Sequence, residues 1–157
     1  MFRPLIHIRN LRFNIAIYVL AASLGASPVL ADNLFYDLTI NVVELKNNAG
    51  VVQFSLYNRE GSLPDKYFER YYKMHTSRID AGSASVTFHD LPAGSYAVNI
   101  LHDENANGKI DTGFVLPVEG VGFSNYRTIN LLNRPDFSKA SFELNSHLSI
   151  FVNIIYM

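Results

Sequence analysis

The 157-residue sequence has no cysteine, no tryptophan and no excess of basic residues. Without cysteine there are no disulfides, thiol nucleophiles, thiolate zinc sites or iron–sulfur clusters, so burial of apolar surface has to stabilise the fold. A formal net charge of −1 provides no positive field for phosphate backbones, and we expect no nucleic-acid partner. The remaining composition, 48% hydrophobic and 17% charged, is that of an ordinary globular domain.

The N-terminal residues have the pattern of a cleavable export signal. Arg3, Arg9 and Arg12 precede an apolar stretch at 13–24, which is too short to cross a membrane as a helix. Small residues then lead up to Ala31, as a signal peptidase requires. We therefore predict a signal peptide over residues 1–31, with an uncleaved membrane anchor as the alternative.

The chain after Ala31 is predicted to be one exported domain, residues 32–157. It holds ten basic and fourteen acidic residues and so carries a formal charge of −4. Its length is sufficient for a single hydrophobic core. No later apolar run approaches the roughly twenty residues of a membrane-spanning helix, so we expect no transmembrane segment in the mature chain. The expected location is the periplasm or the exterior of the cell.

Hydrophobic and polar residues alternate with a period of two in the first part of this domain. The runs at 36–42 and 52–57 predict half-buried strands. The connection between them, residues 46–50, is rich in Asn and ends in Gly, which favours a tight turn. The two strands are therefore predicted to form a hairpin.

A second hairpin is predicted around the Pro/Gly turn at 91–94, with strands at 86–88 and 96–100. Three further short strands are predicted at 128–132, 140–144 and 148–156. About seven strands without βαβ units indicate an all-β protein, an antiparallel β-sandwich.

One segment, residues 63–78, departs from the alternating pattern. Its aromatic and imidazole side chains follow helical spacing after a proline that fits a first helical turn. The residues with this spacing are Phe68, Tyr71, Tyr72 and His75. We predict a short helix or a lid over one end of the sandwich, with a ligand platform as the alternative interpretation.

The stretch from Asp103 to Asp111 matches the pattern D-x-N-x-N-G-x-x-D. Oxygen-bearing side chains at every second position around a glycine are typical of loops that wrap a calcium ion. All-oxygen donors favour calcium over zinc or copper. The predicted metal ligands are Asp103, Asn105, Asn107, the Lys109 carbonyl, Asp111 and Glu119.

The match is not to a helix–loop–helix calcium site. The twelfth position, which holds a bidentate Glu in such sites, is Phe114, and a strand precedes the loop. Glu119 is the candidate for the missing carboxylate, and Glu104 is another. The low charge predicts a structural calcium site of weak affinity, on the order of 10⁻⁴ to 10⁻³ M. The alternative is an Asx-rich turn that its own hydrogen bonds close without an ion.

No catalytic motif accompanies this loop. The hairpin predicted above places His89 and His102 roughly 20 Å apart, at about 3.3 Å per residue, so they cannot share a metal ion. Motifs of serine hydrolases, zinc proteases and phosphate-binding loops are absent from the sequence. We expect a protein that is not an enzyme. His102 is expected to be a strand-end residue, or to bind Asp103 and orient this metal ligand without contacting the ion itself.

Three motifs carry a resemblance to a known family. They are L-P-x-G-x-Y at 91–96, H-D-E-N-x-N-G at 102–108 and G-F-S-N at 122–125. Together they resemble an exported bacterial family catalogued as a domain of unknown function, DUF2141, from about residue 38 to 156. This sequence is one residue shorter than the family pattern between 114 and 119 and has Gly113 in place of Asn. The resemblance implies a secreted or periplasmic single domain and no particular activity.

The turn and the Asp/Asn loop are also similar to elements of calcium-binding B-type repeats in adhesins and of prealbumin-like domains. Both are β-sandwiches, so the resemblance implies an immunoglobulin-like or prealbumin-like fold. Gly120 and Gly122 are expected to serve tight turns, and Phe123 to fill the core. Alternatively, Phe123 and Tyr126 rim a recognition surface beside the loop.

The expected function is structural or binding work in the cell envelope, by a monomer whose partner is an unknown protein or envelope component. Two alternatives stay open. A carrier of a small apolar ligand would have a cavity in its interior or a groove under residues 68–72. A metal-dependent enzyme would cluster His102 with His75 or His147 and nearby acids.

Overall fold

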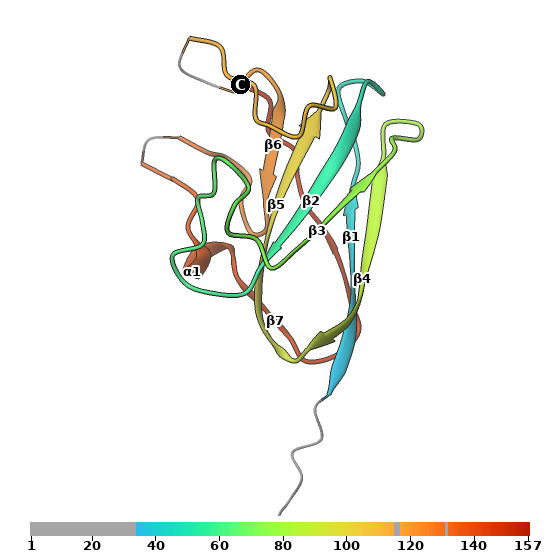
Figure 1. Ribbon diagram of the computed structural model, residues 1–157, viewed down its shortest axis with the longest axis vertical. Coiled ribbons are helices and arrows are strands. Elements are labelled where there is room, and N and C mark those ends of the chain that lie inside the picture. The colour runs from blue at the N-terminus through green and yellow to red at the C-terminus, as the bar shows by residue number, and fades with distance from the viewer. Residues whose placement is uncertain (1–33, 115–116, 131) are drawn as a thin grey trace, which may run out of the picture. The chain divides into compact units, whose positions relative to one another are not determined.

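The computed structural model describes residues 34–114, 117–130 and 132–157. The predicted signal peptide therefore lies outside the described residues. Two β-sheets pack face to face (Figure 1). The first sheet has the strand order β4-β1-β8, formed by Ala84–Pro92, Phe35–Val42 and Leu148–Phe151.

The second sheet has the strand order β3-β2-β5-β6, and β7 pairs with the beginning of β5. These strands are β3 Lys73–Ser77, β2 Val51–Tyr57, β5 Gly94–Asp103, β6 Gly120–Phe123 and β7 Phe142–Leu144. A four-residue helix, α1 at Phe137–Ala140, lies in the connection between β6 and β7. The predicted all-β sandwich is confirmed.

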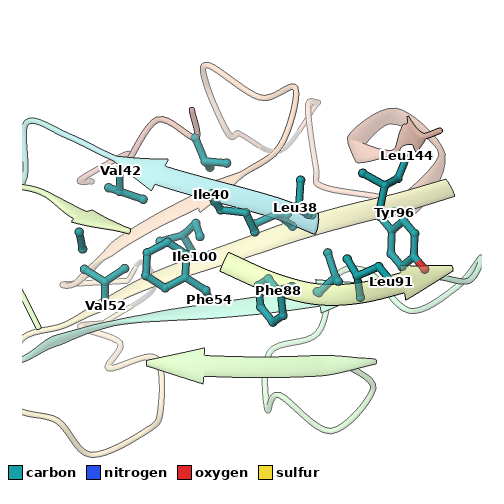
Figure 2. Packing of buried hydrophobic residues seen from close by; sticks show 14 of the residues in the cluster. Leu38, Ile40, Val42, Val52, Phe54, Phe88, Leu91, Tyr96, Ile100 and Leu144 are labelled. Atoms are coloured by element: carbon teal, nitrogen blue, oxygen red, sulfur yellow. The ribbon is translucent and has the colours of Figure 1, made fainter. Parts of the chain in front are cut away.

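The main core lies between the two sheets, where apolar side chains from both meet (Figure 2). Leu38 and Ile40 of β1 face Phe54 of β2 and Ile100 of β5, and all four are fully buried. Burial of one such side chain stabilises the fold by about 1.5–3 kcal/mol. This core takes the place of the disulfides that the chain cannot form.

Both predicted hairpins are wrong. Strand β1 pairs with β4 and β8, whereas β2 pairs with β3 and β5. Strands β4 and β5 also lie in different sheets, and the chain crosses from one to the other at Ala93, whose N–H donates to the Leu34 carbonyl. Alternation in sequence indicates which side chains of a strand share a face, but not the partner of the strand. A short Asn/Gly or Pro/Gly connection can join two strands of different sheets as well as the two strands of a hairpin.

One strand pair also corrects the expectation of a purely antiparallel sandwich. Strand β8 runs parallel to β1, with Leu148 beside Leu38 and Phe151 beside Asn41. The two strands are separated by more than a hundred residues of chain, so no turn constrains their direction. The sheet is therefore mixed.

Residues 63–78 do not form the predicted helix. Residues 73–77 are the edge strand β3, and those before it are turns. Phe68 has a positive φ of 53°, which no helix accommodates, and its ring is buried, whereas Tyr71 and Tyr72 are exposed. The helical spacing of the aromatic residues therefore does not mark one buried face.

The predicted strands near the C-terminus are corrected in their positions. No strand forms among the described residues of 128–132, because Asn130 closes a turn by accepting from the N–H groups of Leu132 and Asn133. Ala140 ends α1, which Asp136 caps by accepting from the Lys139 N–H. Strand β7 begins only after this helix. The strand predicted at 148–156 ends at Phe151.

The chain beyond β8 crosses to the second sheet. Val121 of β6 and Ile155 exchange two backbone hydrogen bonds of 3.0 and 2.8 Å. A Cβ on Gly122 would lie 2.4 Å from the Asn153 carbonyl oxygen, so a side chain at this position would push the segment away. Gly120 and Gly122 are strand residues that permit this close approach, and not the turn residues that we predicted.

Strands β2 and β5 are buried on both faces, although their sequences alternate. Val52, Phe54 and Leu56 face the main core. The opposite face of the sheet carries Gln53, Ser55, Tyr57, Ala97, Asn99 and Leu101. Residues 63–68 and the described parts of 110–140 cover this face and form two smaller apolar clusters on it, which include the predicted core residue Phe123. The half-buried strand expected at 52–57 is thus corrected, because long connections add a third layer, whereas burial alternates along β1 as expected.

Candidate functional site

The Asp/Asn loop connects β5 to β6, which are neighbours in the second sheet. Asp103 is the last residue of β5, and the pairing of His102 with Gly120 brings the end of the connection back to its start. Gly50, directly before β2, packs so closely on this corner that a Cβ there would lie 1.8 Å from the Asp103 carbonyl oxygen. The first residue of the motif is therefore fixed by two neighbouring strands.

Asp103 organises the beginning of the loop. Its side chain is 1% exposed, and its two carboxylate oxygens accept from the N–H groups of Asn107 at 3.0 Å and Gly108 at 2.7 Å. The turn that aims these N–H groups inward needs left-handed backbone at Ala106 and Gly108. The spacing of the motif thus builds a loop wrapped around its first carboxylate.

The two asparagines extend this arrangement to Asp111. Asn105 Oδ1 accepts from the Asn107 N–H, and Asn107 Oδ1 accepts from the Lys109 N–H. The Nδ2 groups of both asparagines donate to the Asp111 carboxylate, at 2.6 Å for Asn105 and 3.1 Å for Asn107. Oxygens from Asp103, Asn105, Asn107 and Asp111 are therefore joined in one hydrogen-bond network.

Glu119 closes the loop from its far end. The side chain is 3% exposed; Oε1 accepts from the Glu104 N–H at 2.9 Å, and Oε2 accepts from the Asp111 N–H at 3.0 Å. A third bond, from the Val118 N–H to the Asp111 carbonyl, holds the returning chain in place. Glu119 thus folds back onto the loop, as expected from the sequence.

Glu104, the other candidate carboxylate, is engaged elsewhere. Its carboxylate lies 2.8 Å from Lys46 Nζ and accepts from Asn47 Nδ2 at 2.8 Å. The hydrogen bond from Lys46, followed by that from Asn47, lowers the pKa of Glu104. This side chain ties the loop to the connection before β2 and does not join the network around Asp111.

Histidine and carboxylate side chains alone do not form a metal site here. In the part of the chain that the structure describes, no three His, Asp or Glu side chains gather closely enough to hold a metal ion. An ion in the loop would therefore need oxygens from Asn105, Asn107 and the backbone as well. This is the ligand set that the sequence pattern predicts.

His102 is fully buried and has structural partners. Its Nε2 lies 3.0 Å from the Ala49 carbonyl oxygen, and its Nδ1 lies 2.6 Å from the Tyr156 hydroxyl. Because a carbonyl only accepts, Nε2 carries a proton and donates to Ala49, and in the tautomer with that single proton Nδ1 accepts from the Tyr156 hydroxyl. The Tyr156 oxygen accepts in turn from the Lys46 N–H. The ring nitrogens of His102 therefore contact neither Asp103 nor the other loop acids.

The other histidines considered in the sequence analysis, His75, His89 and His147, have partners outside the Asp/Asn loop. His89 Nδ1 lies 3.1 Å from the Asp37 carboxylate, and His147 Nδ1 accepts from the Asp37 N–H. The ring of His75 packs against Phe88, with 5.0 Å between the ring centroids and a tilt of 55° between the ring planes. His89 and His102 belong to different sheets, so their separation does not come from the hairpin that we predicted. This arrangement gives no support to an enzyme built on His102.

The buried polar row on β2 and β5 is a feature that the sequence analysis missed. The Gln53 amide nitrogen, the Ser55 hydroxyl and both amide atoms of Asn99 are buried without a hydrogen-bond partner among the described residues. Ser55 and Asn99 are directly opposite each other in the sheet. Their only signal in the sequence was the polar half of an alternating strand, which usually marks a solvent-exposed face.

Comparisons with known proteins give little beyond the family. No helix among the described residues is long and apolar enough to cross a membrane. No curated protein matches the chain. A fimbrial assembly protein from Parabacteroides distasonis is similar in structure, with a TM-score of 0.39 and 7% sequence identity over 78% of this chain. The chain spans about half the length of that protein, 53%.

The family comparison agrees with the motifs. A family described as an uncharacterized protein conserved in bacteria, DUF2141, matches residues 40–150. The matched region contains the L-P-x-G-x-Y turn, the Asp/Asn loop and the G-F-S-N segment, and it covers most of the two sheets. The chain therefore belongs to the bacterial DUF2141 family.

Proposed function

We propose that the loop from Asp103 to Glu119 binds one calcium ion, and that the domain works as an exported binding or structural module of the cell envelope. The observation that supports this proposal is the burial of two carboxylates, Asp103 and Glu119, which face backbone N–H groups of the same loop. The proposed role is binding and not catalysis.

The charges of the loop favour a cation. Asp103, Asp111 and Glu119 form no ion pair within the described residues, whereas Glu104 is paired with Lys46. Buried carboxylates are normally paired with a positive charge or bound to a metal, because removing an ion from water is costly. Backbone N–H groups supply only part of this compensation. A divalent cation would supply the rest.

The donors in reach are hard oxygens, which suit calcium. Asp103, Asn105 and Asn107 would contribute side-chain oxygens, and Lys109 its carbonyl. Asp111 would bind directly or through a water molecule, and Glu119 would close the set. Calcium would compete with the bonds from Asn105 and Asn107 to Asp111. With so few charges, we expect a Kd on the order of 10⁻⁴ to 10⁻³ M, suited to filling by extracellular calcium.

The alternative is a loop that these same hydrogen bonds close without an ion. Thermal melting of residues 32–157 with and without 5 mM calcium distinguishes the two. An ion with the expected Kd stabilises the native state by about 1–2 kcal/mol, which raises the Tm by about 3–8 °C. Magnesium at the same concentration serves as the control for ionic strength and should have a smaller effect.

Variants assign the effect to the loop. Asp103→Asn and Glu119→Gln retain the size of the side chains but remove a charge and one of the two acceptor oxygens, and both should abolish most of the calcium-dependent rise in Tm. Glu143→Gln, at an exposed position on β7, is the matched control and should keep the full rise. An unchanged Tm of the wild type, or an equal rise in the Asp103→Asn variant, would contradict calcium binding.

Export has its own test. The full chain is expected to be processed when it is expressed in a bacterium, and mass spectrometry of the periplasmic and secreted fractions should find a protein that begins at Asp32. Substituting Arg3, Arg9 and Arg12 with acidic residues should retain the unprocessed chain in the cell. Recovery of the intact chain from the cytoplasm of the unmodified strain would contradict the proposed location.

A further inference from the structure

The outer face of the second sheet carries an open groove of about 390 Å³. Its floor is formed by Asn99 of β5 and by Val121 and Phe123 of β6. The walls come from the connections that cover this face, around Pro64 on one side and, on the other, from Ile110, Thr112 and Pro117 and from residues around Ile129 and Pro135. The volume lies at the lower end of the range for small-molecule sites.

The lining is mostly apolar. Its hydrophobic members are Pro64, Ile110, Pro117, Val121, Phe123, Ile129, Pro135 and Met157. An apolar concave surface with a few polar groups is the usual form of a ligand site in a folded domain. The main core between the sheets is separate from this groove, since its residues belong to a different cluster.

Asn99 provides an independent indication of a ligand. Its side chain is 1% exposed, and neither the amide nitrogen nor the amide oxygen makes a hydrogen bond with a described residue. An unsatisfied buried amide costs about 1–3 kcal/mol, so a group at this position is expected to find a partner in the functional state. The groove is the open space that this residue lines.

Tyr57 shows that the surroundings of Asn99 are dry. Burial raises the pKa of the Tyr57 phenol, the nearby Asp65 carboxylate raises it further, and the side chains of Asn99 and Ser55 oppose the rise. The Tyr57 hydroxyl itself donates to Asp65 at 3.3 Å. Tyr57 thus donates to Asp65, whereas the amide of Asn99 is near enough to the phenol to lower its pKa but lies outside hydrogen-bonding geometry with any described residue.

The charged side chains at the groove favour a negatively charged ligand. Lys66 and Arg134 lie on its exposed edge, and neither forms an ion pair with a described residue. The one carboxylate among the lining residues, Asp65, is already bound by Arg70 through its backbone N–H and its guanidinium group. Two free cations and a neutralised acid favour an anion.

We propose that this groove binds a small apolar molecule with a single carboxylate, such as a medium-chain fatty acid. The apolar body would lie against Ile110, Val121 and Ile129. The carboxylate accepts a hydrogen bond from an amide NH₂ group and is attracted by cations, so it suits both Asn99 and the edge formed by Lys66 and Arg134. The proposal does not depend on calcium binding.

Isothermal titration calorimetry of residues 32–157 tests it with octanoate and, as the uncharged match, 1-octanol. For about ten non-hydrogen atoms we expect a Kd for octanoate on the order of 10⁻⁵ to 10⁻⁴ M. The Kd for octanol is expected to be at least threefold higher. No binding of octanoate below 1 mM would overturn the proposal. Equal affinities would overturn the assignment of an acidic group.

Four variants locate the site. Arg134→Gln and Asn99→Leu should weaken octanoate binding about three- to tenfold and change octanol binding by less than twofold. Ile129→Phe, which fills the groove, should weaken both ligands more than tenfold. Arg127→Gln, an exposed residue outside the lining, is the charge-matched control and should leave both affinities unchanged.

The variants also distinguish this site from adventitious binding. Each is first checked for a wild-type melting curve, so that a loss of affinity is not a loss of folding. If Ile129→Phe binds octanoate as the wild type does, the ligand lies elsewhere and the groove is not the site. If Arg127→Gln weakens binding as much as Arg134→Gln, the attraction comes from the net charge alone, and the proposed edge is wrong.

Discussion

The Tyr156 hydroxyl lies 2.6 Å from His102 Nδ1 and joins the end of β5 to the C-terminal segment of the chain. The same oxygen accepts from the Lys46 N–H, so three parts of the sequence meet at one phenol. Burial raises the pKa of Tyr156, which keeps the hydroxyl protonated as a donor at neutral pH. The corner beside the Asp/Asn loop is therefore held by a tyrosine near the end of the chain.

Replacing this tyrosine tests how much the corner depends on it. Tyr156→Phe removes the donor to the buried His102 and the acceptor for the Lys46 N–H but retains the ring that packs on Gly120. The unsatisfied groups predict a loss of about 1–3 kcal/mol in the free energy of unfolding. Urea titration measures it. Tyr67→Phe, at a side chain that is 72% exposed, is the control and should have no measurable effect.

Gly50 predicts a steric effect that can be separated from backbone strain. Gly50 and Gly61 both have left-handed backbone, with φ of 67° and 70°. A Cβ at position 61 meets no atom within 4 Å, whereas one at position 50 would lie 1.8 Å from the Asp103 carbonyl oxygen. Gly61→Ala should therefore cost only the strain of a positive φ, about 1–2 kcal/mol.

Gly50→Ala should cost at least about 2 kcal/mol more than Gly61→Ala, because β2 must move away from the Asp103 corner. Urea unfolding of the two variants gives the difference directly. If Gly50→Ala prevents folding, its yield of soluble protein compared with that of Gly61→Ala gives the same ranking. Equal stabilities would show that β2 and the loop are not packed as closely as described.

The ion pair of Lys46 and Glu104 predicts a pH dependence in two directions. The pKa of Glu104 is lowered from 4.5, chiefly by the hydrogen bond from Lys46, so its contribution is present above pH 4.5 and is lost as the pH falls through the folded value. The pKa of Lys46 is raised from 10.5, chiefly by Glu104, so its contribution is present below pH 10.5 and is lost as the pH rises further.

Glu104→Gln should therefore lower the free energy of unfolding by a constant amount between about pH 5 and pH 10, and the difference from the wild type should decrease as the pH falls below 4.5. The effect is expected to be small because Lys46 is half exposed. Chemical unfolding across this range measures it, with exposed Glu69→Gln as the control. A difference that persists unchanged at pH 3 would show that the carboxylate charge is not its source.

The sequence allowed most of the strands and the loop to be predicted, but not β3, β6 or the way in which the strands are assembled. Alternation located β1 and β2 within a residue or two, because side chains of a strand face opposite sides whatever its partner is. Pairing depends on contacts between distant parts of the chain, such as Leu38 with Leu148, for which a single sequence has no signal. The return of Glu119 to the loop depends on β6, a strand that was not predicted, because the pairing of His102 with Gly120 brings the chain back to the start of the loop.

The groove shows why the rest could not be predicted. Asn99 and Ser55 have the sequence pattern of solvent-exposed positions, and only the packing of residues 63–68 and the described parts of 110–140 over them makes them buried. A third layer built from irregular segments has no periodicity in sequence. Phe68 illustrates the same limit, since its backbone conformation depends on contacts with Leu101 and Val121 and not on its neighbours in the chain.

The two proposed sites share a wall, and this predicts that they are coupled. Ile110, Thr112 and Pro117 line the groove, and they flank Asp111 and Glu119, whose bond closes the loop. An ion that fixes Asp111 also fixes this wall, so calcium should strengthen octanoate binding, by about fivefold, the lower limit of typical coupling between sites. Linkage requires octanoate to strengthen calcium binding by the same factor.

Two titrations, each at zero and saturating concentration of the other ligand, measure both factors. Glu119→Gln should reduce both coupling factors to one, whereas the control Glu143→Gln should leave them unchanged. A Kd for octanoate that is independent of calcium in the wild type would show that the wall is rigid without the ion.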